Sequence, residues 1–223
     1  MNSTKNIAAF FDFDRTLITV SSGQLGFKWL REHNMLTSWF KIQLGFFGML
    51  YKHHLIHELT MMRTFLKFYK GRVLADFQAT GPEFWQLYLK PHLSGKVMKK
   101  VEYHRTNGHI LVLNSGTLRY ILDPVATDIG FEHVLCTDLE VGSDGLMTGK
   151  ADGPICIGEN KRKYLLDLTN EHNIDLEISY AYSDHHSDVP LLESVGNPIV
   201  VEPTAILQKI AEERSWPILN HFQ

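Results

Sequence analysis

Short runs of apolar residues alternate along the chain with longer segments in which apolar residues recur every three or four positions. The runs are typical of buried strands, and the longer segments are typical of helices that bury one face. The clearest run, residues 7–13 (IAAFFDF), leads into the polar sequence Asp12-Phe13-Asp14. We predict strands over residues 7–13, 110–114, 179–182 and 199–201, and a β-hairpin over 134–150.

Helical spacing dominates the stretch between the first two strands. Within residues 23–89, Trp39, Ile42, Phe46 and Met49 recur at intervals of three and four, as on one side of a helix. Strands that alternate with helices are typical of a doubly wound, Rossmann-like α/β fold with a mostly parallel sheet. Further helices are predicted over 92–107, from just after residue 117 to about residue 129, and over 161–172.

The helical stretch is predicted to be an insertion with its own task. Residues 1–18 and 91–223 would form one α/β core domain, and residues 19–90 would form a helical domain. Residues 23–71 carry a net charge of +5, whereas the whole chain carries −3, which leaves −8 for the rest. Residues 27–88 also hold 14 of the 25 aromatic residues. The insertion is therefore basic and aromatic, and the core is acidic.

The overall composition narrows the class of protein. An apolar content of 44% with 21% charged residues is that of an ordinary globular chain. The net charge argues against nucleic-acid binding, and Cys136 and Cys156 are too few for a disulfide framework. Residues 1–17 lack the apolar core of a secretory signal, and residues 36–51 are too short and polar to span a bilayer. We expect a cytoplasmic monomer or homodimer, with peripheral membrane contact through the insertion as an open alternative.

Reactive polar residues follow three of the predicted strands. Asp12 and Asp14 follow the first, Ser115 follows the second, and Asp184 and Asp188 follow the strand at 179–182. The carboxyl ends of the strands form the ligand crevice of a doubly wound sheet, so these side chains are expected to meet. Crowded carboxylates repel one another unless they share a proton or a cation. A hard cation that prefers oxygen ligands, such as Mg²⁺, suits them.

Groups that bind an anion accompany these carboxylates. Ser115 and Gly116 lie at a predicted helix start, where free backbone N–H groups bind anions. Lys161 adds a positive charge, and Lys163 is a competing candidate for that part. A metal, a lysine, a hydroxyl and backbone donors are what phosphoryl transfer requires. One aspartate would then act as the nucleophile and its neighbour as the acid/base.

The sequence resembles the haloacid dehalogenase superfamily, in its phosphoserine-phosphatase-like branch (subfamily IB). All four motifs of that superfamily occur in order across nearly the whole chain. Ser115 or Lys161 alone would be a weak signal, but the four motifs together are very specific. They are Asp12-x-Asp14-x-Thr16, Ser115, Lys161 in Gly158-Glu-Asn-Lys-Arg-Lys163, and Asp184-x-x-x-Asp188 followed by Val189-Pro-Leu-Leu-Glu193.

The resemblance implies a Mg²⁺-dependent phosphatase that hydrolyses a small organic phosphomonoester through an aspartyl-phosphate. It also implies that the insertion is a cap of the C1 type, which shields the site and selects the substrate. The implied site residues are Asp12 as nucleophile, Asp14 as acid/base, Asp12, Asp184 and the Asp14 carbonyl as metal ligands, Asp188 and Thr16 as supporting residues, and Ser115, Gly116 and Lys161 as phosphate ligands.

Departures from the family pattern concern the substrate. Relatives that act on phosphoserine carry a Glu for the substrate amine where this chain has Ser21, whereas Arg63 falls where they have an arginine for the substrate carboxylate. The basic, aromatic insertion favours a phosphomonoester with a sizeable apolar portion, and Arg63 leaves an acidic small metabolite as the alternative. Arg15 and Ser183 stand where many relatives have Gly, and neither change removes a reacting group.

Two other functions fit the same carboxylates. A phosphotransferase or mutase would pass the phosphoryl group from Asp12 to a hydroxyl acceptor. A phospho-accepting receiver domain also clusters carboxylates on a doubly wound sheet, in a shorter chain without a helical insertion. The remaining candidates are the group His53, His57 and Glu58, which we interpret as helix-surface residues because no further metal ligand accompanies them, and His185 and His186 inside the fourth motif.

Overall fold

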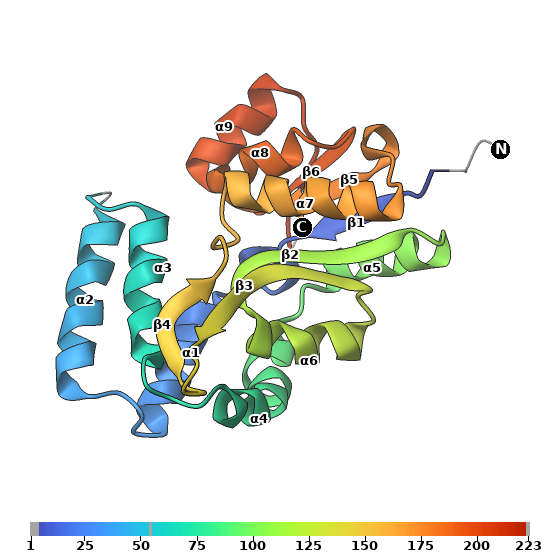
Figure 1. Ribbon diagram of the computed structural model, residues 1–223. Helices are drawn as coiled ribbons and strands as arrows, with labels where there is room; N and C mark the ends of the chain where they lie inside the picture. Colours follow the sequence, from blue (N-terminus) through green and yellow to red (C-terminus); the bar gives the residue numbers. More distant parts are fainter. Residues whose placement is uncertain (1–4, 54, 222–223) are drawn as a thin grey trace.

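The computed structural model describes residues 5–53 and 55–221, without the side chains of residues 51 and 52. It contains a β-sheet between layers of helices (Figure 1). The strands are β1 (Ala8–Phe11), β2 (Ile110–Leu118), β3 (His133–Val141), β4 (Met147–Asp152), β5 (Tyr180–Ser183), β6 (Asn197–Val201) and β7 (Ile218–Leu219). In the described residues their order is β4-β3-β2-β1-β5-β6-β7. β4 runs antiparallel to β3 in the predicted hairpin, and the other pairs are parallel.

β1 lies inside the sheet and is buried on both faces. Its residues Ala8, Ala9, Phe10 and Phe11 have no exposed surface. Side chains of a strand point alternately to its two faces. Ala9 and Phe11 therefore pack into one core cluster, and Ala8 and Phe10 pack into the other. A strand in this place must be apolar at every position, which is the reason for the uninterrupted run in the sequence.

Helices cover both faces of the sheet. They are α5 (Gly95–Thr106), α6 (Arg119–Ile129), α7 (Glu159–His172), α8 (Val189–Leu192) and α9 (Ala205–Glu213). Val97 of α5 and Leu122 of α6 pack on the face of Ala9, whereas Leu165 of α7 and Leu207 of α9 pack on the opposite face. Figure 1 shows α7, α8 and α9 above the sheet and α6 below it. The predicted doubly wound α/β fold is confirmed.

The chain between β1 and β2 is helical, as predicted. It contains α1 (Ser22–Glu32), α2 (Ser38–Lys52), α3 (Glu58–Leu66) and α4 (Leu74–Phe84), with short helical turns at Lys67–Tyr69, Trp85–Leu89 and Lys90–His92. Many of its aromatic side chains are buried in the core, among them Trp29, Phe68, Tyr69, Phe77, Phe84 and Trp85. These rings stabilise the packing of the insertion and are not available as walls of an open substrate pocket.

The predicted end of the second strand was wrong. β2 continues to Leu118, so Ser115 and Gly116 lie inside a strand, and α6 begins only at Arg119. Between Asn114 and Leu118, four residue steps along β2 face two steps along β3. Such a β-bulge adds unpaired residues to one strand. The hydrophobic pattern shows where apolar residues lie but does not show extra residues of this kind.

Other boundaries moved by a few residues or were missed. α5 begins at Gly95 and not at residue 92, because the hydroxyl of Ser94 accepts a hydrogen bond from the N–H of Val97 as an N-cap. α9 and β7 were not predicted, although Leu207 and Ala211 recur at helical spacing and are buried. Within residues 5–53 and 55–221, no helix combines the length and apolar character that crossing a bilayer demands.

Candidate active site

The sheet has a topological switch point at β1, where doubly wound sheets form a ligand crevice at the carboxyl ends of the strands. β2, β3 and β4 extend the sheet on one side of β1, and β5, β6 and β7 extend it on the other. The carboxyl ends of β1, β2 and β5 are therefore neighbours, as at the ligand site of other doubly wound sheets. Asp12 follows β1, Ser115 lies in the last part of β2 and Asp184 follows β5; all three are buried. The three positions therefore lie at neighbouring strand ends, as the sequence predicted, and Asp12 and Asp184 interact electrostatically.

A buried ion-pair network connects Asp12 to α7. Nζ of Lys161, in the first turn of α7, lies 2.7 Å from Oδ1 of Asp12 and 2.6 Å from Oδ2 of Asp188. The hydroxyl of Ser183 donates to the same oxygen of Asp188 at 2.6 Å. Lys163 is exposed to solvent. The structure thus brings Lys161, and not Lys163, to the predicted nucleophile.

When all are ionised, the carboxylates of Asp12, Asp184 and Asp188 exceed the single positive charge of Lys161. Burial raises the pKa of Asp12 to about 7, although Lys161 lowers it. Burial also raises the pKa of Asp184 to about 8, and repulsion from Asp12 and Asp188 adds to the rise. Burial opposes the charge of Lys161, but Asp12 and Asp188 outweigh this effect and hold its pKa above the ordinary value. A further cation would stabilise the ionised carboxylates.

The oxygen atoms at this place suit Mg²⁺. The carboxylates of Asp12 and Asp184 and the main-chain carbonyl of Asp14 are hard donors of the kind that Mg²⁺ prefers. Within the described part of the chain, no three His, Cys, Asp or Glu side chains gather as one metal-binding group. The predicted ligand set consists of two side chains and a carbonyl, and its chemistry fits the ion.

Asp14 is held by different partners. Its carboxylate accepts hydrogen bonds from the backbone N–H and the hydroxyl of Ser22, and from the hydroxyl of Thr117 at 2.8 Å. Ser22 is the first residue of α1, so the helical insertion forms part of the surroundings of Asp14. Burial raises the pKa of Asp14, and these hydrogen bonds partly offset the rise. The sequence analysis did not predict Ser22 or Thr117 as site residues, although Ser22 follows Ser21 and Thr117 lies two positions after Ser115.

The loop behind Asp14 has a strained backbone. Arg15 has a φ of 56°, in the left-handed region that favours glycine, which explains why glycine suits this position. Nε2 of His221 lies 2.9 Å from the carbonyl oxygen of Arg15, and Nδ1 lies 2.7 Å from the hydroxyl of Ser94. His221 can thus donate to the carbonyl while accepting from Ser94. Thr16 is buried, and its hydroxyl has no hydrogen-bond partner among the described residues.

Gly116 allows β2 to approach the segment that precedes α7. A Cβ atom at Gly116 would lie 3.2 Å from Cγ1 of Ile157 and 3.5 Å from the carbonyl oxygen of Cys156. Any larger residue would push this segment away, and Lys161 follows it closely in the chain. The bulge at Ser115 and Gly116 and the start of α7 therefore face each other across the crevice.

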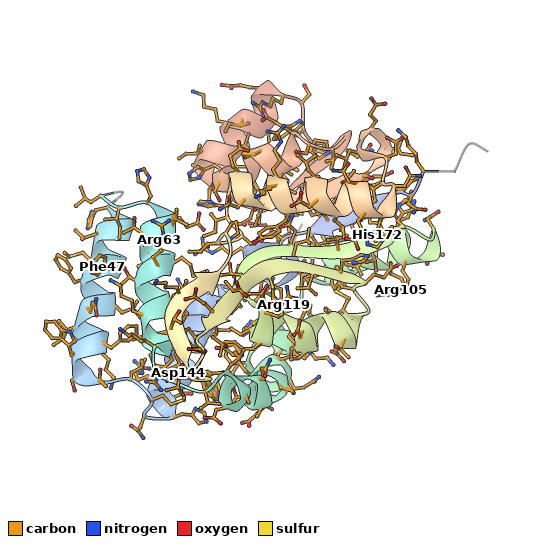
Figure 2. All side chains as sticks on the ribbon, in the orientation of Figure 1. Phe47, Arg63, Arg105, Arg119, Asp144 and His172 are labelled. Carbon is orange, nitrogen blue, oxygen red and sulfur yellow. The ribbon has the colours of Figure 1, made fainter. Side chains whose placement is uncertain are left out.

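Arg63, which Figure 2 labels on α3, lines a pocket beside the ion-pair network. Together with Lys67 and Lys150 it borders a pocket of about 540 Å³ between α3, β4 and the start of α7. Asn160, the residue before Lys161, also lines this pocket, and none of its lining residues is acidic. The pocket therefore adjoins the segment that carries Lys161 and has a positive character.

Glu58 brings the start of α3 close to the fourth motif. Burial and the nearby charge of Asp188 raise the pKa of Glu58, while Lys161 and a hydrogen bond with Ser187 lower it. His185 contacts the hydroxyl of Ser187 at 2.8 Å and caps the local turn. His53 and His57, which the sequence analysis grouped with Glu58, lie between α2 and α3. The prediction that these histidines lie on the surface of one helix was therefore wrong.

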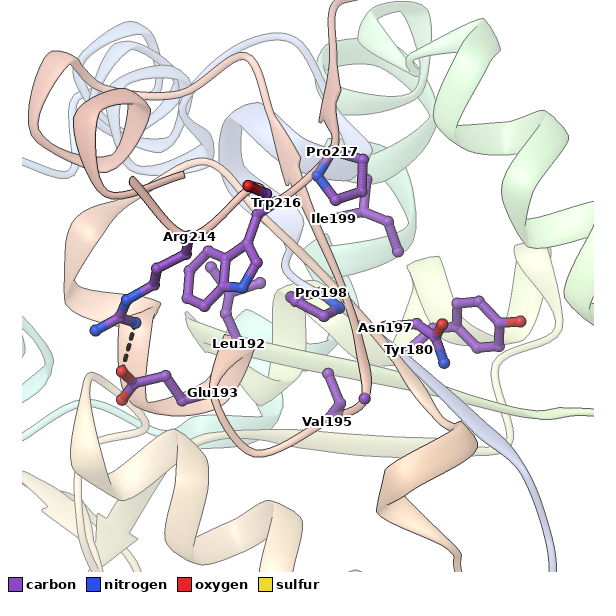
Figure 3. Close-up of a pocket in the computed structure, with 12 residues that line it drawn as sticks. Tyr180, Leu192, Glu193, Val195, Asn197, Pro198, Ile199, Arg214, Trp216 and Pro217 are labelled. Carbon is purple, nitrogen blue, oxygen red and sulfur yellow. Dashed lines mark ion pairs between the residues drawn. The ribbon is translucent and has the colours of Figure 1, made fainter. Parts of the chain in front are cut away.

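A different pocket, of about 740 Å³, lies away from this crevice (Figure 3). Tyr180 and Asn197, the first residues of β5 and β6, line it, so it opens at the amino ends of these strands. Trp216 forms another wall, and Arg214 pairs with Glu193 at its rim. It contains neither the paired carboxylates nor Lys161, and we do not assign it to the active site.

Comparison with known proteins agrees with this geometry. The family model for haloacid dehalogenase-like hydrolases matches residues 9–193. A histidinol-phosphatase of Neisseria meningitidis is 32% identical over 97% of this chain and 99% of its own length. The phosphoserine phosphatase SerB1 of Mycobacterium tuberculosis is 30% identical over 95% of this chain and 70% of its own length. A solved structure of a protein of unknown function from Bordetella pertussis has a TM-score of 0.88 at 25% identity, and covers 98% of this chain and 100% of that one.

The strand order, the carboxylates at the end of β1 and these alignments define a phosphatase with a doubly wound α/β fold. The chain belongs to the haloacid dehalogenase-like hydrolase family, and its relatives place it with the phosphoserine-phosphatase-like members. The resemblance predicted from the four motifs is confirmed. The helical insertion and the family membership exclude the alternative of a phospho-accepting receiver domain.

Proposed function

We propose that this protein is a Mg²⁺-dependent phosphomonoesterase that acts through an aspartyl-phosphate on Asp12. The observation that carries the proposal is the buried contact of Lys161 with Asp12 and Asp188 at the carboxyl end of β1. All three side chains are buried, and charges shielded from water act strongly on a bound anion. A phosphate ester bound here would meet a nucleophile and a cation side by side, with the carboxyl group of Asp14 on the same loop.

The proposed Mg²⁺ ligands are Asp12, Asp184 and the carbonyl of Asp14, with Asp188 beside them. When bound, the ion would neutralise charge on the phosphoryl oxygens and so allow an anionic nucleophile to approach phosphorus. Lys161 and Ser183 hold the carboxylate of Asp188 in place.

The proposed reaction has two steps. In the first, an oxygen of Asp12 bonds to phosphorus, the bond to the ester oxygen breaks, and Asp14 gives its proton to the leaving oxygen. In the second, Asp14 takes a proton from water as the water oxygen attacks phosphorus, which releases phosphate and restores Asp12. Burial raises the pKa of Asp14 and so favours the protonated form that the first step needs. Ser22 and Thr117 fix the orientation of its carboxyl group.

Binding of the transferred group would fall to Ser115, the N–H of Gly116 and Lys161. We further propose that residues 1–18 and 91–223 form the catalytic domain and that residues 19–90 form the cap. Two contacts across this division, of Ser22 with Asp14 and of Glu58 with Ser187, support a cap that closes beside the site, with Thr16 as part of the loop below it.

We infer that the substrate carries a second acidic group. The pocket is lined by Arg63, Lys67 and Lys150 and by no acidic residue, and aliphatic side chains such as Leu59 and Ile155 form the rest of its wall. The three positive charges support the acidic small metabolite over the apolar ester of the sequence prediction. Of the two activities named for the relatives, a phosphatase for phosphoserine acts on an ester with a carboxylate, whereas histidinol phosphate has none. The charge of the pocket favours the ester with the carboxylate, with Arg63 as its partner.

Phosphate release from p-nitrophenyl phosphate tests the proposed activity. We expect turnover with Mg²⁺, loss of turnover with EDTA and recovery on adding Mg²⁺. Asp12→Asn should abolish turnover, because an amide cannot form the acyl-phosphate. Asp144→Asn, in the exposed turn of the β3–β4 hairpin, is the matched control and should leave turnover unchanged. Transfer of the phosphoryl group to an added alcohol in place of water would identify the phosphotransferase instead.

A further inference from the structure

Helix α2 presents an apolar face to solvent. Trp39, Ile42, Phe46 and Met49 are 73%, 65%, 54% and 52% exposed. With 3.6 residues per turn, these four side chains fall within an arc of about 80° around the helix. A single exposed apolar residue needs no explanation, but a continuous stripe of four large ones marks an interaction surface. We call these four residues the α2 stripe.

The opposite side of α2 packs against the insertion. Leu44 is buried, and the ring of Phe40 lies 5.4 Å from the ring of Phe68. Figure 1 shows α2 at the edge of the molecule, separated from the sheet by α3. The helix is thus anchored through one side, and the described residues leave the α2 stripe uncovered.

The segment around the α2 stripe is basic. Residues 33–57 contain Lys41 and Lys52 but no Asp or Glu. Lys41 is exposed, and the helical geometry places it about 80° around the helix from Met49, next to the stripe. An apolar stripe that holds a Trp and a Phe, with lysine beside it, is the pattern of helices that lie in the interface of a membrane.

The charge of this segment distinguishes between two kinds of occupant. A second copy of the chain would meet the same surface, because a twofold contact is self-complementary. Two segments without an acidic residue would then face each other, and their like charges would repel. An anionic bilayer instead offers acyl chains to the stripe and phosphate groups to Lys41. The surface chemistry therefore favours the bilayer.

We propose that the α2 stripe docks this protein on anionic membrane surfaces. At 15 residues α2 is about 22 Å long, shorter than the hydrocarbon core of about 30 Å, so it would lie along the surface and not cross it. This inference does not depend on the proposed catalytic function. It turns the peripheral membrane contact that the sequence left open into a defined site.

Sedimentation with vesicles tests the proposal directly. The protein would be mixed with vesicles of phosphatidylcholine alone, or of phosphatidylcholine and phosphatidylglycerol in equal parts. We expect binding to the anionic vesicles to be at least about tenfold tighter, and the double variant Ile42→Gln, Phe46→Gln to lose it. Leu87→Gln changes an equally exposed leucine outside α2 and should bind like the unchanged protein. Lys41→Glu should weaken binding to the anionic vesicles.

Two results would overturn the proposal. One is absence of binding to the anionic vesicles by the unchanged protein. The other is a dimer, in analytical ultracentrifugation, that the double variant converts to monomer, because the stripe would then be a protein interface. The double variant and the Lys41→Glu variant should have the circular dichroism spectrum and the unfolding midpoint of the unchanged protein. This comparison excludes misfolding as the cause of lost binding.

Discussion

The hydroxyl of Thr117 lies 2.8 Å from Asp14, yet Thr117 belongs to none of the four motifs. The motifs predicted which reactive groups meet, and Asp12, Lys161 and Asp188 do meet. They did not predict what orients these groups, because orientation depends on hydroxyls brought in from other elements. Ser22 from α1 shows the same lesson.

Thr117→Val should weaken the acid/base step. Removing the hydroxyl leaves one oxygen of Asp14 with a single partner, Ser22, so the carboxyl group can turn away from the leaving oxygen. We expect kcat for an alkyl phosphate to fall by about ten- to a hundredfold. The fall should be smaller for p-nitrophenyl phosphate, whose leaving group needs no proton. Thr127→Val, at an exposed hydroxyl of α6, is the control; equal losses for both esters would argue that Thr117 has only a structural role.

At the scale of elements, the sequence predicted the middle of most strands and helices well and their ends poorly. The uninterrupted run of β1 and the hairpin of β3 and β4 follow from local patterns, and both are present. The bulge in β2 depends on pairing with β3 and leaves no local pattern. His221 contacts a carbonyl 206 positions earlier in the chain, a distance at which no sequence pattern points to a partner.

The contact of α4 with α6 explains a buried glycine. A Cβ atom at Gly81 would lie 2.3 Å from the carbonyl oxygen of Tyr120, so Gly81→Ala must separate the two helices. We expect a loss of about 1–3 kcal/mol in the free energy of unfolding, measured with urea. A Cβ atom at Gly45 in α2 would meet no neighbouring atom within 4 Å, so Gly45→Ala should instead raise the free energy of unfolding by up to about 1 kcal/mol. A Gly81→Ala protein as stable as the unchanged one would refute this packing.

For the whole molecule, the insertion combines two surfaces with different chemistry. Most of its aromatic residues belong to, or pack against, a core that the insertion shares with one face of the sheet. The composition alone did not reveal this, because counts do not distinguish buried from exposed rings. Its basic residues Arg63 and Lys67 face the pocket beside α7. In the proposed function, the positive charge predicted for the insertion would act on the substrate, and most of the aromatic content would not.

The double variant Arg63→Gln, Lys150→Gln tests the acidic-group inference. We expect kcat/KM for 3-phosphoglycerate to fall by about tenfold or more, since two charge-assisted contacts are lost. The same value for glycerol 3-phosphate, which lacks the carboxylate, should change little. Lys163→Gln, at an exposed lysine of α7, is the control. Equal losses for both esters would show that the pocket does not read the second acidic group.

The covalent intermediate tests the central claim most directly. With Asp14→Asn, p-nitrophenyl phosphate should still transfer its phosphoryl group, because its leaving group needs no proton, whereas hydrolysis of the intermediate should be slow. Acid-quenched protein should then carry a phosphoryl group on Asp12, removable by hydroxylamine and identified by mass spectrometry. Asp12→Asn should carry none. Phosphate on another residue, or continued turnover of the Asp12→Asn protein with no covalent phosphate, would contradict the account.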